Sequence, residues 1–230
     1  MIYLAAGNSR RFGNYEVRDE KTGKIKKYTN KLLYKLDEKP MYLYLLERLL
    51  NICERHSEWE VLVVTQYREI YREVLKLKDH ARPIRPVWSP DSVKGVSYSV
   101  KAGVLAALAR QECKKPECGG VLQMGMEDQN ASEVMPEACA FFVADQPYLT
   151  EKSAEDFLRE MEMHKAALGS VRCRGQAGNP TWFSRAYFRE LLELAGDKGG
   201  RKVLMAHPEA VRYYEIEHEK ELQDIDHYSG

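Results

Sequence analysis

The sequence predicts an α/β protein in which a mainly parallel β-sheet is covered by helices on both faces. Short apolar runs alternate along the chain with longer segments whose apolar residues recur at helical spacing. One of the runs, Val61-Leu62-Val63-Val64, is typical of a strand that is buried on both faces. Because strand and helix alternate, the pattern favours parallel strands joined by helical crossovers.

Individual strands and helices follow from these patterns. Buried strands are predicted at residues 1–6, 60–65 and 138–143, and a short strand at residues 83–88. Helices are predicted at residues 40–53, 68–78, 97–110 and 151–165. Two segments interrupt the pattern: 14–30 contains a charged turn and is a hairpin candidate, and 111–136 is predicted to be a surface excursion. We expect residues 1–230 to form a single domain.

Bulk composition limits the kinds of function. Hydrophobic residues make up 44% and charged residues 30%, and Lys+Arg and Asp+Glu both count 35, so the formal net charge is zero. A neutral chain lacks the excess positive charge of a general polyanion binder, so we expect no nucleic-acid binding. No apolar run approaches the roughly 20 residues needed to cross a bilayer, and the N-terminus shows no signal-peptide pattern.

The five cysteines are scattered along the chain, which favours reduced thiols over a disulfide framework. Cys113 and Cys118 lie close together, but no second Cys or His pair accompanies them, so a structural zinc site is not favoured. We therefore expect a cytoplasmic protein.

Ligands of parallel α/β sheets bind beyond the carboxyl ends of the strands. The first predicted strand leads into the loop Leu4-Ala5-Ala6-Gly7-Asn8-Ser9-Arg10-Arg11-Phe12-Gly13. Backbone N–H groups in such a turn can bind an anion, and Arg10, Arg11 and Lys31 can add cationic contacts to phosphate. An ordinary turn with solvated arginines is the alternative. The glycine spacing matches neither the dinucleotide fingerprint nor a P-loop.

A second candidate is Asp145, which follows the predicted strand 138–143 in the segment Ala144-Asp145-Gln146-Pro147. A carboxylate in this position can hold Mg²⁺ next to phosphates. The alternative is that Asp145 caps the next helix, but Thr150 already stands at the cap position before Glu151.

Two more carboxylates, Asp224 and Asp226, are separated by one residue near the C-terminal end. In a strand their side chains would share one face and could approach one metal ion. The alternative is a solvated edge, in keeping with the acidic run at 215–221.

Glycines also cluster around polar residues in Gly178-Asn179-Pro180 and in Gly196-Asp197-Lys198-Gly199-Gly200-Arg201. This pattern indicates backbone that bends around a ligand, with Lys198 and Arg201 available to anions. A plain helix stop at Gly196 is the alternative.

Taken in order, these segments resemble the molybdenum-cofactor nucleotidyltransferases, which are members of the wider MobA-like NTP transferase group. The glycine loop with Asn30-Lys31-Leu32-Leu33 is similar to the family's nucleotide-binding signature, and the segment around Asp145 is similar to its metal-site motif. The segments similar to its C-terminal landmarks are 178–180, 196–201 and 224–226. The resemblance spans nearly the whole chain.

The resemblance implies a Rossmann-like three-layer α/β sandwich, the nucleotide-diphospho-sugar transferase fold. It implies transfer of a nucleotidyl group from a nucleoside triphosphate to a phosphorylated acceptor, with release of pyrophosphate. The cytidylyl branch is similar to this chain in having Ala5-Ala6 before Gly7, whereas the guanylyl branch tends to have Gly at the second position. We therefore expect CTP rather than GTP, a pterin-type acceptor such as the molybdopterin cofactor, and a molybdenum hydroxylase as a partner.

Roles for single residues are also implied by the resemblance. Mg²⁺ is expected on Asp145 and Asp226. The expected catalytic residues are Lys31, Arg11 and Asp145. The expected nucleotide-binding residues are Leu4, Ala5, Ala6, Gly7, Asn8, Ser9, Arg10, Arg11 and Lys31. The expected substrate-binding residues are Gly178, Asn179, Pro180, Asp197 and Arg201.

The sequence departs from the family pattern in the long link 14–30 before Lys31, in the segment 111–136, and at His227, where the family favours Thr. Two alternatives to the expected activity stay open. One is a guanylyl- or sugar-phosphate nucleotidyltransferase of the same fold. The other is a non-catalytic cofactor-binding chaperone for a molybdenum hydroxylase.

Overall fold

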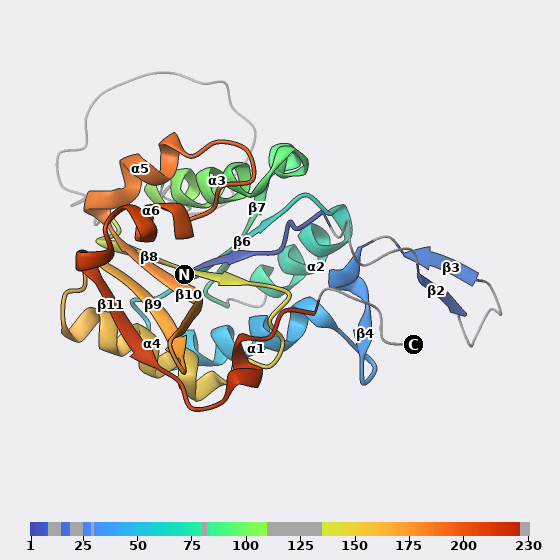
Figure 1. Cartoon of the computed structure of the whole chain (residues 1–230). Coiled ribbons are helices and arrows are strands. Elements are labelled where there is room, and N and C mark those ends of the chain that lie inside the picture. The colour runs from blue at the N-terminus through green and yellow to red at the C-terminus, as the bar shows by residue number, and fades with distance from the viewer. Residues whose placement is uncertain (9–14, 19–24, 29, 80–81, 110–134, 226–230) are drawn as a thin grey trace, which may run out of the picture.

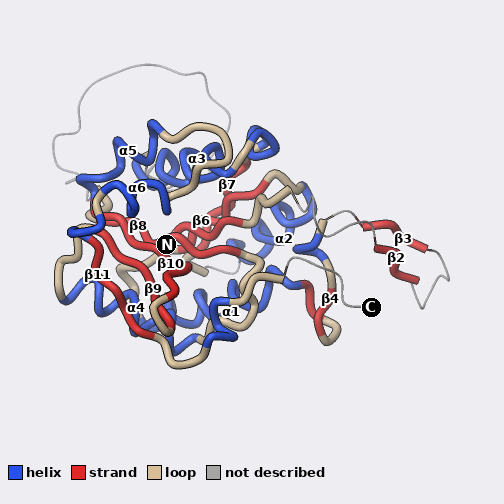
Figure 2. The backbone as a smooth tube through the Cα atoms, in the orientation of Figure 1, coloured by secondary structure: helices blue, strands red, loops and turns tan. Residues whose placement is uncertain are grey.

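In the computed structural model of the protein, a twisted central sheet lies between two layers of helices (Figures 1 and 2). The described residues are 1–8, 15–18, 25–28, 30–79, 82–109 and 135–225, and for 15–18, 25–28 and 79 the backbone alone is described.

The central sheet has seven strands in the order β11-β9-β10-β8-β1-β6-β7. Their bounds are β1 Ile2–Leu4, β6 Val61–Thr65, β7 Ile84–Trp88, β8 Ala138–Val143, β9 Leu168–Cys173, β10 Gln176–Ser184 and β11 Val211–Glu215. The pairs β1–β6, β1–β8, β6–β7 and β9–β11 are parallel, and β10 runs antiparallel to both β8 and β9. The predicted α/β fold with a mainly parallel sheet is therefore confirmed.

Helices and short hairpins complete the chain. The α-helices are α1 Met41–Arg55, α2 Arg68–Asp79, α3 Val96–Leu108, α4 Glu151–Met163, α5 Phe188–Glu193 and α6 Arg201–Ala206. The 3₁₀ helices are η1 Lys31–Leu33, η2 Pro90–Lys94, η3 Arg185–Tyr187, η4 Pro208–Ala210 and η5 Glu219–Leu222. Two hairpins pair β2 Tyr15–Arg18 with β3 Ile25–Tyr28 and β4 Lys35–Leu36 with β5 Lys39–Pro40.

The two faces of the sheet bury alternate residues of each strand, because successive side chains of a strand point to opposite sides. Tyr3 and Phe142 pack in the core with α1, α2 and α4, whereas Ile2 and Phe141 pack with α3, α5 and α6. In Figure 1 the first set of helices lies below the sheet and the second set above it. The molecule thus has the three layers of the implied sandwich.

Helix α1 shows why the sequence forms this layer. Leu45, Leu46, Leu49 and Leu50 recur at helical spacing and are completely buried. Each such side chain contributes about 1.5–3 kcal/mol when it leaves water. The stripe therefore holds α1 against the sheet beneath the carboxyl end of β1.

The last part of the sheet was not predicted from the sequence. Strand β10 contains Gly178-Asn179-Pro180, residues that are unfavourable in the interior of a strand. The register with β9 shifts between Gly178 and Thr181, which is where a bulge accommodates them. The hairpin prediction for 14–30 is confirmed for the described strands, which project from the body in Figure 1. Most of the predicted excursion, 110–134, lies outside the described residues.

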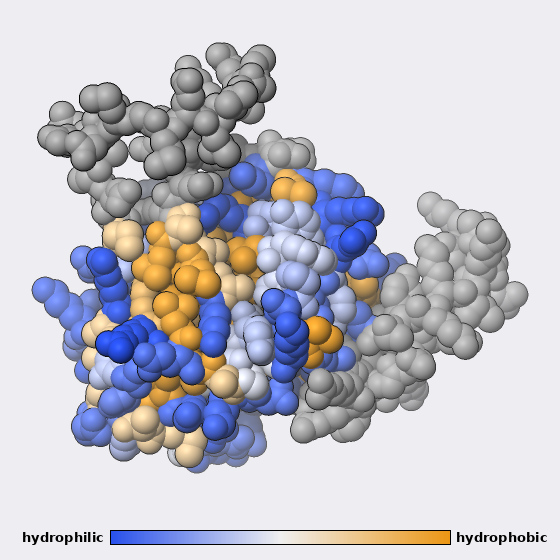
Figure 3. Space-filling model, turned by 90° about the horizontal axis from the view of Figure 1, so that it is seen from above, coloured by the Kyte–Doolittle hydropathy of each residue, from blue (hydrophilic) through white to orange (hydrophobic). Residues whose placement is uncertain are grey.

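The face formed by α3, α5 and α6 carries a gathering of hydrophobic residues beside polar ones (Figure 3). Leu105 of α3 and Met205 of α6 are among the large exposed apolar side chains of the molecule. Within the described ranges, no helix is both long enough and apolar enough to cross a bilayer.

Candidate functional site

The first two predicted segments leave the sheet side by side at its carboxyl edge. The backbone N–H of Ala5 donates to Val64 O at 2.8 Å, and the N–H of Ala144 donates to Leu4 O at 3.1 Å. The glycine loop after β1 and the Asp145 segment after β8 therefore start from adjacent points.

Side chains that follow β6 hold the described part of the glycine loop. Gln66 Nε2 donates to Ala6 O at 2.6 Å and to Asn8 Oδ1 at 2.9 Å. Tyr67 Oη donates to Gly7 O at 2.5 Å. The backbone carbonyls of the loop are thus bound to the protein. The remaining loop residues, 9–13, which include Ser9, Arg10 and Arg11, lie outside the described residues.

The loop between β7 and α3 approaches the glycine loop from the other side. Asn8 Nδ2 donates to the carbonyl of Val93 in η2 at 2.9 Å. Further along, Gly95 has φ of +145°, and Ser97 N donates to Gly196 O at 3.1 Å. The hydroxyl oxygen of Ser97 is completely buried and has no hydrogen-bond partner among the described residues. Three loops distant in sequence therefore form one wall of the site.

The predicted residue Asp197 belongs to this wall. A Cβ added at Gly95 would lie 2.9 Å from Asp197 Oδ1, so Asp197 lies directly against the turn that begins α3. Arg201 is exposed at the first position of α6. Helix α5 ends at Glu193, three positions before Gly196, which has φ of +63°.

Lys31 and Asp145 meet at the centre of the carboxyl edge. Lys31 Nζ donates to Asp145 Oδ2 at 2.7 Å, and the two residues are 114 positions apart in sequence. The side chain of Lys31 is 8% exposed and that of Asp145 is 26% exposed. Asn30 Oδ1 accepts a hydrogen bond from Leu32 N at 3.0 Å and caps the 3₁₀ turn that carries Lys31. The contact is a partly buried, charge-assisted pair.

A buried tyrosine lies beneath Asp145. Burial raises the pKa of Tyr3 well above its ordinary value, and the nearby negative charge of Asp145 raises the pKa further. The hydroxyl of Tyr3 donates to Tyr42 O at 2.7 Å. Tyr3 therefore stays protonated and serves as a packed floor for the site.

The segment after Asp145 is held by α1 and leads into α4. Arg48 Nη1 donates to Pro147 O at 2.7 Å and to Leu149 O at 2.6 Å. Thr150 caps α4, because its hydroxyl oxygen accepts a hydrogen bond from Ser153 N at 3.1 Å. The predicted cap is confirmed, and Asp145 is therefore not needed as a helix cap.

Residues 223–225 form an irregular segment, so Asp224 does not lie in the strand that would have set its side chain on one face with that of Asp226. The segment still reaches the site: Ile225 N donates to the backbone oxygen of Asp145 at 3.0 Å. The backbone N–H of Ile225 is thus bonded to the Asp145 loop and not to a neighbouring strand. Asp226 itself lies outside the described residues.

The segment Gly178-Asn179-Pro180 lies at the same edge of the sheet. Since β10 runs antiparallel to β8, residues before Thr181 lie beside the carboxyl end of β8. A Cβ at Gly178 would lie 3.1 Å from Leu222 Cδ2, and Gln146 Nε2 donates to Leu222 O at 3.1 Å. The bond between Asn179 and Pro180 is cis. The structure thus brings this segment to the loop that carries Asp145.

Several residues that support the site were missed from the sequence: Arg48, Gln66, Gly95, Ser97 and Glu221. Gln66 directly follows β6, and Gly95 lies in the loop after β7. Both positions lie beyond the carboxyl end of a strand, where ligands of α/β sheets bind, and this is the sequence signal that points to them. Arg48 and Glu221 carry no local signal, because they act on residues far away in the chain.

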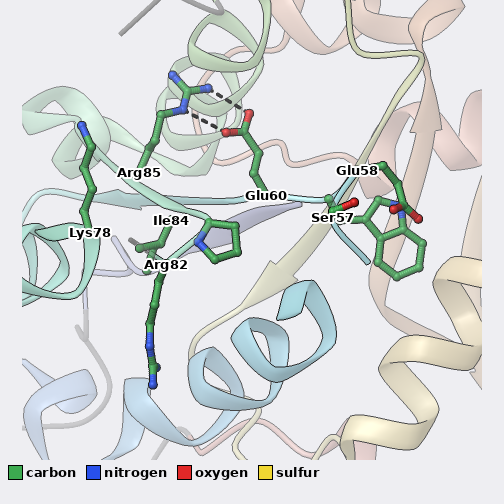
Figure 4. Close-up of a pocket in the computed structure, with 9 residues that line it drawn as sticks. Ser57, Glu58, Glu60, Lys78, Arg82, Ile84 and Arg85 are labelled. Atoms are coloured by element: carbon green, nitrogen blue, oxygen red, sulfur yellow. Dashed lines mark hydrogen bonds and ion pairs between the residues drawn. The ribbon is translucent and has the colours of Figure 1, made fainter. Parts of the chain in front are cut away.

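A separate cavity of about 430 Å³ opens at the amino ends of β6 and β7, away from the carboxyl edge (Figure 4). Glu60 and Arg85 pair at 3.1 Å on its wall. Lys78 and Arg82 point in different directions in Figure 4. These cations do not converge on one point, so the cavity is not the candidate site. Among the described residues, no group of three or more His, Cys, Asp or Glu is arranged to hold a metal ion.

The sequence model of the MobA-like NTP transferase domain matches residues 1–211. The chain belongs to the MobA-like NTP transferase family. Its fold and family make it a nucleotidyltransferase. A search of curated protein sequences finds no match.

Solved structures share the fold at low sequence identity. Rv0371c from Mycobacterium tuberculosis H37Rv is 18% identical, with a TM-score of 0.63, over 99% of this chain and 92% of that chain. A manganese complex of the same mycobacterial protein is 17% identical, with a TM-score of 0.56, over 94% and 87% of the two chains. A nucleotidyl transferase from Methanothermobacter thermautotrophicus is 20% identical, with a TM-score of 0.59, over 99% and 91%. Molybdopterin-guanine dinucleotide biosynthesis protein A from Archaeoglobus fulgidus is 15% identical, with a TM-score of 0.50, over 93% and 82%.

Proposed function

We propose that the protein transfers a nucleotidyl group from a nucleoside triphosphate, with CTP favoured over GTP, to a phosphorylated pterin-type acceptor such as the molybdopterin cofactor. Mg²⁺ is the proposed metal ion. The observation that carries the proposal is the 2.7 Å contact between Lys31 Nζ and Asp145 Oδ2. It joins a cation suited to phosphate and a carboxylate suited to a metal ion at the edge where α/β folds bind ligands.

The proposed triphosphate side is the glycine loop with Lys31. The carbonyls of Ala6 and Gly7 accept hydrogen bonds from Gln66 and Tyr67, so side chains of the protein hold that part of the loop in place. A loop fixed in this way loses little conformational entropy when it binds phosphates. The family resemblance adds Arg10 and Arg11 as further triphosphate contacts.

The proposed metal side is formed by carboxylate oxygens, which are the ligands that Mg²⁺ prefers. Asp145 supplies one carboxylate. Ile225, the residue before Asp226 in the sequence, is held at this loop by the hydrogen bond from its backbone N–H to Asp145 O. These donors fit a hard divalent cation, and a relative of the same fold has been solved with manganese. Such a cation would neutralise negative charge on the triphosphate and the acceptor.

The reaction proposed here needs little covalent help from the protein. An oxygen of the acceptor phosphate attacks the α-phosphorus, the bond from this phosphorus to the oxygen bridging to the β-phosphate breaks, and pyrophosphate leaves. That nucleophile is already ionised at neutral pH, so no general base is required. Lys31 and Arg11 would stabilise the negative charge on the departing pyrophosphate, and alignment supplies the rest. The acceptor would lie against Gly178-Asn179-Pro180, Asp197 and Arg201.

The choice of nucleotide and acceptor rests on two features. Ala6, a buried residue of the loop, resembles the cytidylyl branch at the position where the guanylyl branch tends to have Gly. For the acceptor, one structural relative is named for molybdopterin-guanine dinucleotide biosynthesis, which supports a pterin as acceptor.

A ligand screen followed by a turnover assay tests the proposal. The melting temperature is measured with CTP, GTP, ATP or UTP in the presence of Mg²⁺, because a ligand that prefers the native state raises it. We expect the largest rise with CTP, and then pyrophosphate release when purified molybdopterin cofactor is added. A larger rise with GTP would reverse the nucleotide assignment. Tight cofactor binding without pyrophosphate release would favour the chaperone, and turnover with sugar phosphates alone would replace the pterin.

A further inference from the structure

Glu221 is the one carboxylate-bearing residue among the described residues that is buried, with 5% of its surface exposed. It lies in the 3₁₀ helix η5 near the C-terminal end. A buried charge destabilises a protein unless polar groups compensate for its lost hydration. The hydrogen-bond partners of Glu221 therefore indicate which part of the protein the buried carboxylate holds in place.

Both side-chain hydrogen bonds that the structure describes for Glu221 go to Thr150, the N-cap residue of helix α4. Glu221 Oε2 accepts from Thr150 N at 2.9 Å and from Thr150 Oγ1 at 2.8 Å. A negative charge at a helix N-terminus is also stabilised by the helix dipole. Thr150 is five positions after Asp145, on the same loop. The burial of Glu221 thus ties the C-terminal segment to the loop that carries Asp145.

Neighbouring contacts extend this connection on both sides of Glu221. Lys220 Nζ lies 4.4 Å from the centre of the Tyr148 ring. Gln146 Nε2 donates to Leu222 O, and Ile225 N donates to Asp145 O. Residues 219–225, which we call the C-terminal strap, therefore follow the Asp145 loop closely. The strap ends immediately before Asp226.

We propose that Glu221 is a positioning residue that holds the C-terminal strap, which contains Asp224, against the Asp145 loop at the proposed metal site. The inference rests on the proposed function, because it assumes a metal ion at Asp145. Groups that orient metal ligands commonly change metal affinity or activity 10- to 100-fold when they are removed. In this proposal Glu221 acts through its side-chain length, which lets an oxygen accept the two hydrogen bonds from Thr150, and not through its charge.

Two substitutions separate reach from charge. Glu221→Gln keeps the length of the side chain and an oxygen that can accept both bonds from Thr150, but removes the charge. Glu221→Asp keeps the charge, but shortens the side chain by one C–C bond, about 1.5 Å. Glu219→Gln is the matched control, because Glu219 lies in the same 3₁₀ helix and its side chain is 68% exposed.

Mn²⁺ affinity is measured by electron paramagnetic resonance in the presence of a non-hydrolysable CTP analogue. Amide hydrogen exchange of residues 219–225 is measured on the same proteins without metal. We expect Mn²⁺ affinity within about threefold of wild type for Glu221→Gln and Glu219→Gln, and a loss of about tenfold or more for Glu221→Asp. We also expect faster exchange of the strap in Glu221→Asp.

Each other result overturns the inference in a distinct way. Faster exchange in Glu221→Asp with unchanged Mn²⁺ affinity would show that Glu221 stabilises the strap without serving the metal ion. Weaker Mn²⁺ binding by Glu221→Gln together with unchanged Mn²⁺ binding by Glu221→Asp would show that the charge of Glu221 is what matters. A wild-type protein that binds no Mn²⁺ with the nucleotide analogue would overturn the proposed function, which the first two results leave standing.

Discussion

Asp145 is the single residue on which the proposed chemistry depends most, since it faces Lys31 and follows the central strand β8. We expect Asp145→Asn to lower turnover by about 100-fold or more, because the amide cannot supply the negative charge that binds a divalent cation. The amide oxygen can still accept the hydrogen bond from Lys31, so the fold should stay intact. Pyrophosphate release and the melting temperature are the two measurements.

The control for this substitution is Asp156→Asn, which removes an acid on α4 that pairs with Lys152 at the surface. Asp156→Asn should leave turnover unchanged, because a surface pair contributes at most about 1 kcal/mol to stability. Near-normal turnover of Asp145→Asn at saturating Mg²⁺ would contradict the assignment of Asp145.

Gly7 and Gly103 provide a second prediction at the scale of residues, because they are glycines for different reasons. A Cβ at Gly7 would meet no described atom within 4 Å, so the folded chain itself tolerates alanine there. A Cβ at Gly103 would lie 2.5 Å from Ile2 Cγ2 in the core. We expect Gly103→Ala to lower the free energy of unfolding by about 1–3 kcal/mol through overpacking.

Gly7→Ala should instead keep the stability of the free protein, within about 0.5 kcal/mol. It should reduce the affinity for CTP by about tenfold, because a methyl group at Gly7 would stand between the backbone and the phosphates. Urea unfolding without ligand and CTP titration by calorimetry separate the two effects. Unchanged CTP affinity in Gly7→Ala would argue that the phosphates lie elsewhere.

At the scale of elements, helix α1 holds the loop between β8 and α4 through one side chain. Arg48→Met removes the two hydrogen bonds to Pro147 O and Leu149 O while keeping most of the side-chain volume. We expect a loss of stability of about 1–3 kcal/mol, because two partly buried carbonyls lose their donor. We also expect turnover to fall by about tenfold or more, because Asp145 is carried by the loop that is released.

Arg55→Met on the same helix is the comparison. Arg55 also connects α1 to α4, through Glu151 and Glu155, but it is 45% exposed. Its ion pairs are worth about 0–1 kcal/mol, and its loss should not change turnover. Equal effects of the two substitutions on turnover would show that the loop is not positioned by Arg48.

At the scale of the whole molecule, buried thiols connect the core to alkaline stability. Burial raises the pKa of Cys53 and of Cys139 from 9.0 to about 11 in each case. A raised pKa in the folded state means that the native protein keeps a proton that the unfolded chain loses. The contribution of the two protonated thiols to the free energy of unfolding is therefore complete below pH 9 and is lost as the pH rises towards 11.

The expected loss is at most about 2–3 kcal/mol per thiol, since each pKa unit corresponds to about 1.4 kcal/mol. Urea unfolding at pH 8, 9.5 and 11 under reducing conditions measures it. In the double variant Cys53→Ala and Cys139→Ala, stability should fall less steeply between pH 9 and pH 11, although the variant starts from a lower value. An equal slope in wild type and variant would assign the alkaline loss to other groups.

What the sequence by itself determined is the local part of the structure. Apolar runs such as Val61-Leu62-Val63-Val64 predicted buried strands, and the leucines of α1 predicted its buried stripe, because burial imposes a period of two on strands and about 3.6 on helices. The glycine loop and Asp145 were found because both follow such strands. The family follows from the order of these segments along the chain.

Only the tertiary structure decided which distant groups meet. Lys31 reaches Asp145 across 114 positions, and Glu221 reaches Thr150 across 71, through strand order and loop packing that no local pattern encodes. The same is true of residues 223–225, whose backbone bonds to the Asp145 loop instead of to a strand. Periodicity reports which side of an element is buried, whereas its partner depends on the free energy of the whole packed chain.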